Sequence, residues 1–524
     1  MADQQKDLTE NTLSSQRSWS EAIAACFQGR VVAMLFLGFS AGLPILLIFS
    51  SLSLWLREAG VARSTVTFFS WAALGYSFKF VWAPLVDRLP LPFLTSWLGR
   101  RRSWLLLAQL AVIGALVFMA SNDPQNSLTL VAVGAVLLGF SSATQDIVID
   151  AYRIEAADES LQALMSSSYI AGYRIGMLAA GAGALWLASW FGSGDGAAYS
   201  YTAWSQAYLC MAAAMLIGVV TTFCIREPDV QTSVHKYGTP DYLRFLGLFL
   251  VATVVFALTF VYFKQWVAPL TDILNVVVDK LVASFIAEVS RLLTSLVAAL
   301  VAARLMVKLH VVSPAMVDET YVAPFRDFFF RYGKLALFIL LLVGTYRISD
   351  IVMGAVANVF YDDMGYTKDQ IAGITKTFGL LMTIAGGFLG GLLAIRYGVL
   401  KSLWLGAFLA AASNLLFALL AVSKPEVWML AGVIAADNLS GGLASAAFVA
   451  YLSGLTNRAF TAMQYAVFSS LMTLLPKLLA GYSGSMVDAV GYPSFFIGSA
   501  LIGFPVLLLV TYVGRRVPHS PSQR

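Results

Sequence analysis

Charged residues are scarce in this sequence of 524 residues. Asp, Glu, Lys and Arg make up 12% of it, hydrophobic residues make up 59%, and the mean hydropathy is +0.77. A soluble core cannot bury so much apolar surface, so this composition excludes an ordinary water-soluble protein. The apolar residues come in continuous runs, such as 105–119, rather than in the alternation of a membrane β-strand. This pattern excludes a β-barrel and leaves membrane-spanning helices.

Histidine and cysteine are also rare, with three of each. Neither set has the spacing of a metal site, and the cysteines do not form the even set of a disulfide framework. Without a paired His and Glu motif or a Ser/His/Asp set, we expect a transporter rather than a membrane-embedded enzyme or receptor. We expect no metal and no cofactor beyond a proton gradient. The formal net charge of +5 arises in short loops, which favours a role in topology over binding of nucleic acid.

Apolar segments of about 20 residues, the length that a helix needs to cross hydrocarbon, recur along the chain. Six are predicted in a first half, at 31–55, 66–86, 104–121, 128–151, 163–190 and 205–225. Six more are predicted in a second half, at 334–360, 370–396, 402–422, 427–452, 463–487 and 494–513. An insert at 242–310 adds two, and we expect its charged residues, Arg291 among them, to lie at the membrane surface. The sequence therefore predicts an all-α integral membrane protein of about 14 helices.

These spans divide the chain into five parts. They are a tail at 1–29, a six-helix half at 30–226, a linker with the insert at 227–332, a second six-helix half at 333–514 and a tail at 515–524. Lys and Arg gather in the loops on the side of the tails, so both tails are predicted to be cytoplasmic. The segments 83–102 and 390–401 echo each other, which predicts two related halves that rock in alternating access.

Nine charged residues are predicted inside the spans, where each costs roughly 3 kcal/mol and must face the bundle interior. They are Lys79, Asp146, Asp150 and Arg174 in the first half, and Arg347, Asp350, Lys376, Asp437 and Lys477 in the second. Five are positive and four negative, which favours an anionic substrate. The two arginines are the better carboxylate or phosphate ligands, because a guanidinium binds bidentately whereas lysines act as point charges. Structural pairing among these charges remains an alternative.

Asp146 and Asp150 are one helical turn apart and share a helix face. Two carboxylates so close cannot both ionise freely in a poorly hydrated cavity, so with Asp350 they are the candidates for proton coupling. Asp150 has a second interpretation, because it lies near a predicted helix end. There it pairs with Arg153 or with the loop at 100–102, as a gate or a structural latch.

Other polar side chains flank these charges and suit a sugar, through stacking and amide hydrogen bonds. They complete the candidates for substrate binding: Tyr76, Gln145, Tyr173, Asn438 and Gln464. The candidates for a gate are the charged residues between the second and third spans, which are Asp87, Arg88, Arg100, Arg101 and Arg102. The glycine pairs 386–387 and 390–391 favour close helix packing over a phosphate loop.

Several short motifs lie in or next to these spans. They are GFSAGLP at 38–44, FKFVWAPLVDR at 78–88 with GRRR at 99–102, SATQDIVIDA at 142–151, GYRIGM at 172–177, KTFGL at 376–380 and NLSGG at 438–442. In these motifs the chain resembles the AmpG-type muropeptide permeases of the major facilitator superfamily. The resemblance implies the facilitator fold and proton-driven import of anhydromuropeptides from periplasm to cytoplasm for peptidoglycan recycling. These ligands are N-acetylglucosamine–anhydro-N-acetylmuramic acid with or without peptide.

The resemblance also implies the inner membrane of a Gram-negative bacterium and a sugar- and carboxylate-bearing substrate, and we expect a monomer whose other partner is the lipid bilayer. The insert departs from the family pattern, in which extra helices often follow the twelfth span. Related acetyl-coenzyme A transporters leave an alternative substrate open, which is another organic anion such as acetyl-coenzyme A or a peptide conjugate.

Overall fold

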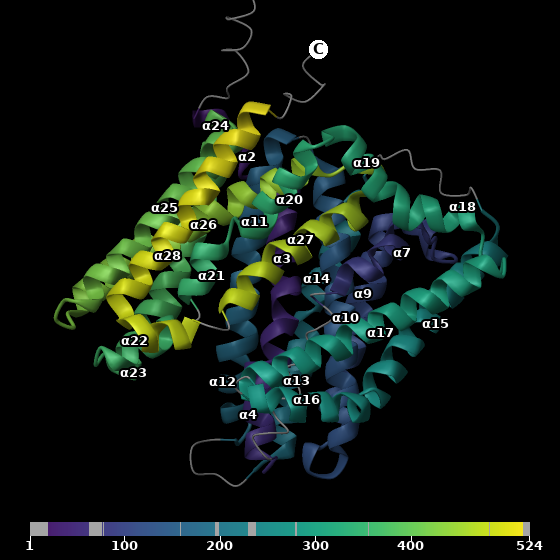
Figure 1. Cartoon of the computed structure of the whole chain (residues 1–524), viewed down its shortest axis with the longest axis horizontal. Helices are drawn as coiled ribbons and strands as arrows, with labels where there is room; N and C mark the ends of the chain where they lie inside the picture. The colour runs from purple at the N-terminus through teal and green to yellow at the C-terminus, as the bar shows by residue number, and fades with distance from the viewer. Residues whose placement is uncertain are drawn as a thin grey trace, which may run out of the picture. The chain divides into compact units, whose positions relative to one another are not determined.

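The computed structural model describes residues 19–61, 76, 78–157, 159–193, 199–228, 237–277, 280–354, 356–480 and 483–516. Every element assigned in these ranges is a helix (Figure 1). Twelve of the described helices are long and apolar enough to cross a membrane, which confirms an all-α membrane protein. The count of 14 is not confirmed. Residues 66–75 and 77 of the predicted span 66–86 lie outside the described residues, and 463–487 coincides with α27 (Thr461–Ala480) only as far as 480.

Both halves are built from long helices with short breaks. The first half contains α2 (Trp19–Ala25), α3 (Gly29–Ile48), α4 (Ser50–Glu58), η2 (Lys79–Val81), α7 (Ala83–Arg88), α8 (Leu94–Leu98), α9 (Arg100–Ala120), α10 (Pro124–Ala156), α11 (Glu159–Leu178), η3 (Ala179–Gly183), α12 (Ala184–Trp190), α13 (Tyr201–Ala214) and α14 (Leu216–Cys224). The second contains α20 (Leu335–Thr345), α21 (Ile348–Gly354), α22 (Ala357–Asp363), α23 (Lys368–Ile371), η5 (Ala372–Phe378), α24 (Gly379–Tyr397), α25 (Val399–Ala421), α26 (Val427–Leu455), η6 (Arg458–Phe460), α27 and α28 (Ser483–Arg516).

A glycine turn occurs at equivalent places in the two halves. Gly99 precedes α9 with a φ of 87°, and Gly398 precedes α25 with a φ of 92°. Only glycine adopts a positive φ of this kind at little cost. The two halves therefore enter their third span by the same turn, which supports the predicted echo between 83–102 and 390–401.

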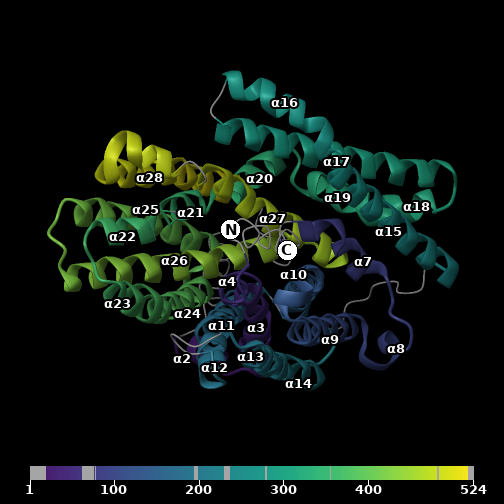
Figure 2. The same ribbon diagram turned by 90° about the horizontal axis from the view of Figure 1, so that it is seen from below.

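Glycines also allow neighbouring helices to touch backbone to backbone. α3 and α11 lie side by side (Figure 2), and a Cβ at Gly42 or Gly172 would lie 2.0 or 1.9 Å from a carbonyl oxygen of the facing helix. No side chain fits at those distances. In the second half, a Cβ at Gly386 of α24 would lie 2.0 Å from a carbonyl oxygen of α26. This close approach confirms helix packing as the role of the glycines at 386–387 and 390–391.

An aromatic core lies inside the first half. Trp55 at the end of α4 stacks on Trp204 of α13 with ring centroids 6.0 Å apart, and Tyr208 lies 4.8 Å from the Trp55 ring. The Trp55 and Trp204 side chains are fully buried. The Trp204 indole donates to Glu58, so its polar atom is satisfied.

The insert forms a second compact unit with residues 87–89, which we describe by itself. Its helices are α15 (Thr239–Tyr262), α16 (Lys264–Val277), α17 (Lys280–Lys308), α18 (Pro314–Val317), η4 (Asp318–Val322) and α19 (Ala323–Tyr332). The placement of Arg291 at the membrane surface stays a prediction, and within this unit its side chain is buried rather than exposed. Its guanidinium is buried 3.7 Å from the ring centroid of Phe260, because α17 packs against α15 and the aromatic face attracts the cation. Asp272 is exposed, as expected.

Candidate functional site

One end of the bundle is closed by buried polar contacts between the two halves. We call it the latch end, and α9 and α27 begin there while α10 ends there. The Arg101 guanidinium donates to both carboxylate oxygens of Glu155, at 2.5 and 2.9 Å, and to the hydroxyl of Thr461, at 2.7 Å. The Thr461 hydroxyl in turn donates to Glu155. These three buried residues, which we call the latch, join the first half to the second.

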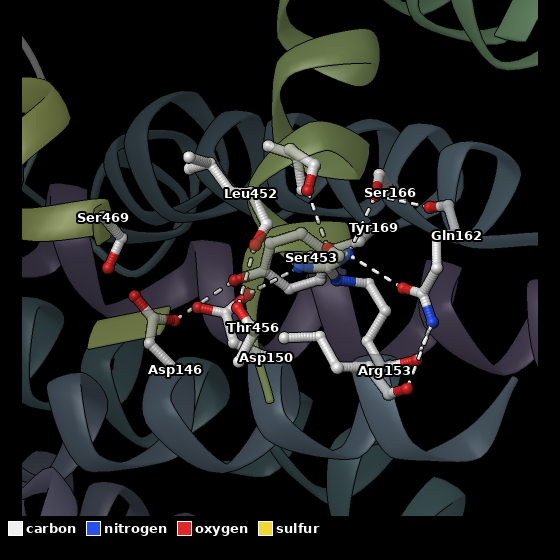
Figure 3. Close-up of polar contacts among 12 residues, drawn as sticks. Asp146, Asp150, Arg153, Gln162, Ser166, Tyr169, Leu452, Ser453, Thr456 and Ser469 are labelled. Atoms are coloured by element: carbon white, nitrogen blue, oxygen red, sulfur yellow. Dashed lines mark hydrogen bonds and ion pairs between the residues drawn. The ribbon is translucent and has the colours of Figure 1, made fainter. Parts of the chain in front are cut away.

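Arg153, half a turn before Glu155 on α10, makes a second bridge (Figure 3). Its guanidinium donates to Ser166 of α11 at 3.0 Å and to Ser453 of α26 at 2.7 Å. It also pairs with Asp150 at 3.5 Å. A fully buried guanidinium must be paired in this way, since an isolated buried charge is far too costly. The bridge therefore holds only while the second half stays against α10.

Backbone carbonyl groups complete the closure at the latch end. Ser167 donates across the halves to the carbonyl oxygen of Gly387 at 2.6 Å, and Arg458 donates to that of Ala157 at 3.3 Å. Small side chains pack beside them, because Ala450 of the second half is buried against Ala163 of the first. This conformation is closed at the latch end, so opening that end requires these bonds to break.

The first half holds a cluster of three buried charged residues next to Arg153. The Lys79 ammonium lies 3.5 Å from a carboxylate oxygen of Asp150. Asp146 interacts electrostatically with Lys79 and with Asp150, and accepts a hydrogen bond from the Tyr169 hydroxyl at 3.3 Å. The structure thus brings Lys79, Asp146 and Asp150 together. Asp150 also pairs with Arg153, so the geometry fits both interpretations of Asp150.

The second half holds a matching cluster. The Arg347 guanidinium lies 2.6 Å from a carboxylate oxygen of Asp350 and donates to the Ser445 hydroxyl. Asp437 accepts a hydrogen bond from Ser413 at 3.0 Å and interacts electrostatically with Asp350 and Arg347. The predicted residues Arg347, Asp350 and Asp437 therefore form one site, with a guanidinium at its centre.

Arg174 of the first half lies near the second-half cluster. It is exposed although it lies within a membrane span, and it interacts electrostatically with Arg347 and Asp350 of the second half. An exposed charge that faces the opposite half must lie in water between the halves, because contact with lipid would be costly. On the same helix, the Tyr173 ring lies 5.9 Å from the Tyr169 ring. Two arginines, one carboxylate and two phenol rings suit an anionic, ring-bearing ligand.

Four predicted binding residues have helix-packing or end-of-bundle contacts instead. Tyr76 donates to Ser142 at 2.5 Å, and Gln145 is fully buried and donates to Ser40 at 3.0 Å. Asn438 accepts from Thr383 between α24 and α26, at 2.8 Å. The Gln464 side chain accepts from Arg331 and from the backbone of Asn457 near the latch end. Tyr76 also interacts electrostatically with Asp146 of the first-half cluster.

The predicted gate is brought together only in part. Arg100 pairs with Glu155 at 3.4 Å, and Arg102 donates to the last carbonyl oxygens of α14, at 3.0 Å each. Asp87 and Arg88 belong to the other compact unit, so the structure does not relate them to the latch. The side chains of Lys376 and Lys477 lie outside the described residues.

Sequence reasoning missed two acidic residues at the latch end. The Glu227 carboxylate accepts the backbone N–H groups of Arg101 and Arg102, at 2.7 and 3.0 Å, and so caps the start of α9. Burial raises the pKa of Glu227, although these two hydrogen bonds act in the opposite direction. Glu155 lies two residues after Arg153 in the sequence, and this neighbouring opposite charge was a signal that could have identified it. Thr461 offered none, because an uncharged hydroxyl costs little in a span.

Comparisons with known proteins identify the family. The family model for acetyl-coenzyme A transporter 1 matches residues 30–190. The transporter AmpG 4 of Rickettsia conorii is 31% identical over 488 residues, which cover 93% of this chain and 97% of the relative. This chain belongs to the AmpG family of transporters. The anhydromuropeptide permease of Escherichia coli K12 is 29% identical over 92% of this chain and 79% of its own length.

Solved structures agree on the fold of this AmpG-family member. The proton:xylose symporter XylE bound to 6-bromo-6-deoxy-D-glucose superposes with a TM-score of 0.57 at 12% identity. The match covers 96% of this chain and 97% of XylE. The protein is therefore a multi-pass membrane transporter with the facilitator fold, and the resemblance found in its motifs is confirmed.

Proposed function

We propose that this protein imports anhydromuropeptides from the periplasm to the cytoplasm in symport with protons, by alternating access in the inner membrane. The observation that carries the proposal is the buried group of Asp146, Asp150 and Lys79, with Tyr169 donating to Asp146. Asp150 pairs with both Lys79 and Arg153, whereas Asp146 forms no ion pair of its own within the described residues. A buried carboxylate without such a pair is costly in its charged form, so Asp146 is the group that a proton would neutralise. The relative from Escherichia coli is named an anhydromuropeptide permease.

The substrate would bind between the two halves. Arg174 of the first half and Arg347 of the second interact across the water-accessible space, and each offers the bidentate fork that suits a carboxylate. The Tyr173 ring on α11 offers a face for a sugar. An N-acetylmuramic acid derivative carries both chemical groups, so this part of the transporter matches that substrate class.

Proton binding would be linked to opening by a chain of contacts. Asp146 interacts with Lys79, Lys79 pairs with Asp150, Asp150 pairs with Arg153, and Arg153 donates to Ser453 of the second half. When a proton neutralises Asp146, Lys79 turns to Asp150 alone and competes with Arg153 for it. The Arg153 bridge between the halves is thereby weakened, and the latch end opens toward the predicted cytoplasmic side.

Uptake into proteoliposomes tests this proposal. With an imposed proton gradient, the wild type should accumulate labelled N-acetylglucosamine–anhydro-N-acetylmuramic acid, and a proton ionophore should abolish accumulation. Asp146→Asn keeps shape and hydrogen bonding but cannot ionise, so it should retain counterflow and lose accumulation. Asp318→Asn, which alters an exposed carboxylate paired with Arg326, is the matched control and should accumulate normally. Accumulation by Asp146→Asn at the wild-type level would remove Asp146 from the coupling site.

A second substrate class has support of its own. The family model that matches residues 30–190 is described as acetyl-coenzyme A transporter 1. Acetyl-coenzyme A carries phosphates that would suit the same two arginines. The same proteoliposomes should therefore be offered labelled acetyl-coenzyme A. Saturable uptake of it, with no uptake of the disaccharide, would favour this alternative.

A further inference from the structure

A large open cavity lies at the latch end, apart from the charged clusters of the transport site. It is formed by the start of α3, the end of α10 and the end of α14, and its volume is about 1230 Å³. Pockets for drug-sized ligands measure about 300–1,000 Å³, so this space holds a larger molecule. The residues that determine its chemistry are Arg30, Tyr152, Arg226 and Arg458.

The cavity presents positive charge that its own acidic residues do not neutralise. Within the described residues, Arg30 and Arg226 form neither a hydrogen bond nor an ion pair, and both are exposed. The two carboxylates in the lining already have partners. Glu155 is bound by Arg101, and Glu227 accepts the two backbone N–H groups at the start of α9. An anion that enters therefore meets unsatisfied guanidinium donors.

The other wall of the cavity is apolar and exposed. Phe36 of α3 is 45% exposed, and Ile217 and Val220 of α14 are 41% and 60% exposed. These residues belong to membrane spans, so their exposed faces contact hydrocarbon chains. Basic groups at the end of two spans, with an apolar wall beside them, match the two chemical parts of a phospholipid.

We propose that this cavity binds an anionic phospholipid. Its head-group phosphate accepts hydrogen bonds from Arg30 and Arg226, and its acyl chains lie along Phe36 and Val220. Arg458 belongs to the second half and already donates to the carbonyl oxygen of Ala157 in the first. A phosphate bound beside it therefore bridges both halves and stabilises the conformation that is closed at the latch end.

The test uses the purified full-length protein in detergent, with the thermal unfolding midpoint as the readout. Dioleoyl-phosphatidylglycerol at saturating concentration should raise the wild-type midpoint by about 4 °C. Dioleoyl-phosphatidylcholine and inorganic phosphate should each have less than half that effect. The double variant Arg30→Gln/Arg226→Gln should lose the response to phosphatidylglycerol. The control Lys401→Gln/Arg515→Gln removes two exposed basic residues that do not line the cavity, and it should respond like the wild type.

Four outcomes would overturn the proposal. An equal response to phosphatidylcholine would mean that only the apolar wall is filled, and an equal response to inorganic phosphate would mean that no lipid is required. A full response of the Arg30→Gln/Arg226→Gln variant would place the lipid elsewhere. Loss of the response in the control variant would reveal a general effect of surface charge. Native mass spectrometry of the wild type checks the result without any substitution, since phosphatidylglycerol should remain bound where phosphatidylcholine is lost.

Discussion

Replacing Thr461 by valine removes the contacts that the latch makes between the two halves. The Thr461 hydroxyl accepts a hydrogen bond from Arg101 and donates one to Glu155, and both partners belong to the first half. The ion pair between Arg101 and Glu155 stays intact, because the substitution touches neither residue. Valine has nearly the shape of threonine, so Thr461→Val weakens the closed conformation without leaving an unpaired charge.

The magnitude follows from the kind of bond that is lost. Hydrogen bonds to charged groups contribute about 1.5–3 kcal/mol each, and each 1.4 kcal/mol is a factor of ten in an equilibrium. Loss of one such bond should therefore raise the population open at the latch end by about 10- to 150-fold. Water can replace the second bond at the opened surface, so we do not expect the two effects to add in full.

Cysteine labelling measures this population. Ala450, which is buried against Ala163 of the other half, is changed to cysteine in a protein that lacks Cys26, Cys210 and Cys224. A maleimide reagent reaches position 450 only when the latch end opens, so its labelling rate reports the open population. Thr461→Val should raise the rate at least about tenfold. The control Thr456→Val removes a buried hydroxyl whose hydrogen bond, among the described residues, is to the carbonyl oxygen of Leu452 in the same half, and it should leave the rate unchanged. A rate for Thr461→Val within twofold of the parent would refute the latch.

Three further predictions concern packing, pH and binding. Gly172→Ala places a Cβ against a carbonyl oxygen of α3, so it should lower stability to thermal unfolding by about 1–3 kcal/mol or more, whereas Gly183→Ala, which has open space, should not. The folded-state pKa of Glu227 lies above its ordinary value of 4.5, so the stability that its protonation contributes is lost as pH rises through the raised pKa. Glu227→Gln should therefore flatten the pH dependence of the thermal unfolding midpoint above pH 4.5. Arg174→Lys keeps the charge but loses the fork, so it should weaken binding of a carboxylate-bearing substrate about tenfold, measured by calorimetry, and an unchanged affinity would show that Arg174 supplies only charge.

The spans were predictable because the bilayer demands long apolar helices. The predicted spans 104–121 and 402–422 correspond to α9 and α25 within a few residues at each end. The fourth span was underestimated, since α10 continues to Ala156 rather than ending at 151. The apolar run that predicts the span ends before the charged residues Arg153 and Glu155. Both residues remain helical and buried because Glu155 pairs with Arg101 and Arg153 pairs with Asp150, and a hydropathy profile does not report ion pairs.

The charged residues of the site were predictable from the sequence, whereas the uncharged residues that contact them were not. A charge within a span is costly, so the rule found Lys79, Asp146 and Asp150, which the structure joins. The contacts across the two halves instead join Arg153 to the Ser453 hydroxyl and Glu155 to the Thr461 hydroxyl. Each of these two residues is about 300 residues away from its partner along the chain. A hydroxyl can be satisfied on the preceding turn of its own helix, as Ser453 also is by Val449, so nothing in its sequence context marks it as a bridge.

The proposed proton site and Glu155 of the latch lie on one helix, α10, and this arrangement predicts an order of events. Asp146 and Glu155 are nine residues apart on α10, a rise of about 14 Å, with Asp150 and Arg153 between them. Neutralising Asp146 would change the contacts among Lys79, Asp150 and Arg153 within the first half, so it needs no movement of one half against the other. Opening instead breaks the bonds of Arg153 and Glu155 to the second half. Protonation should therefore precede opening of the latch end, which is the order that a symporter importing its substrate toward that end requires.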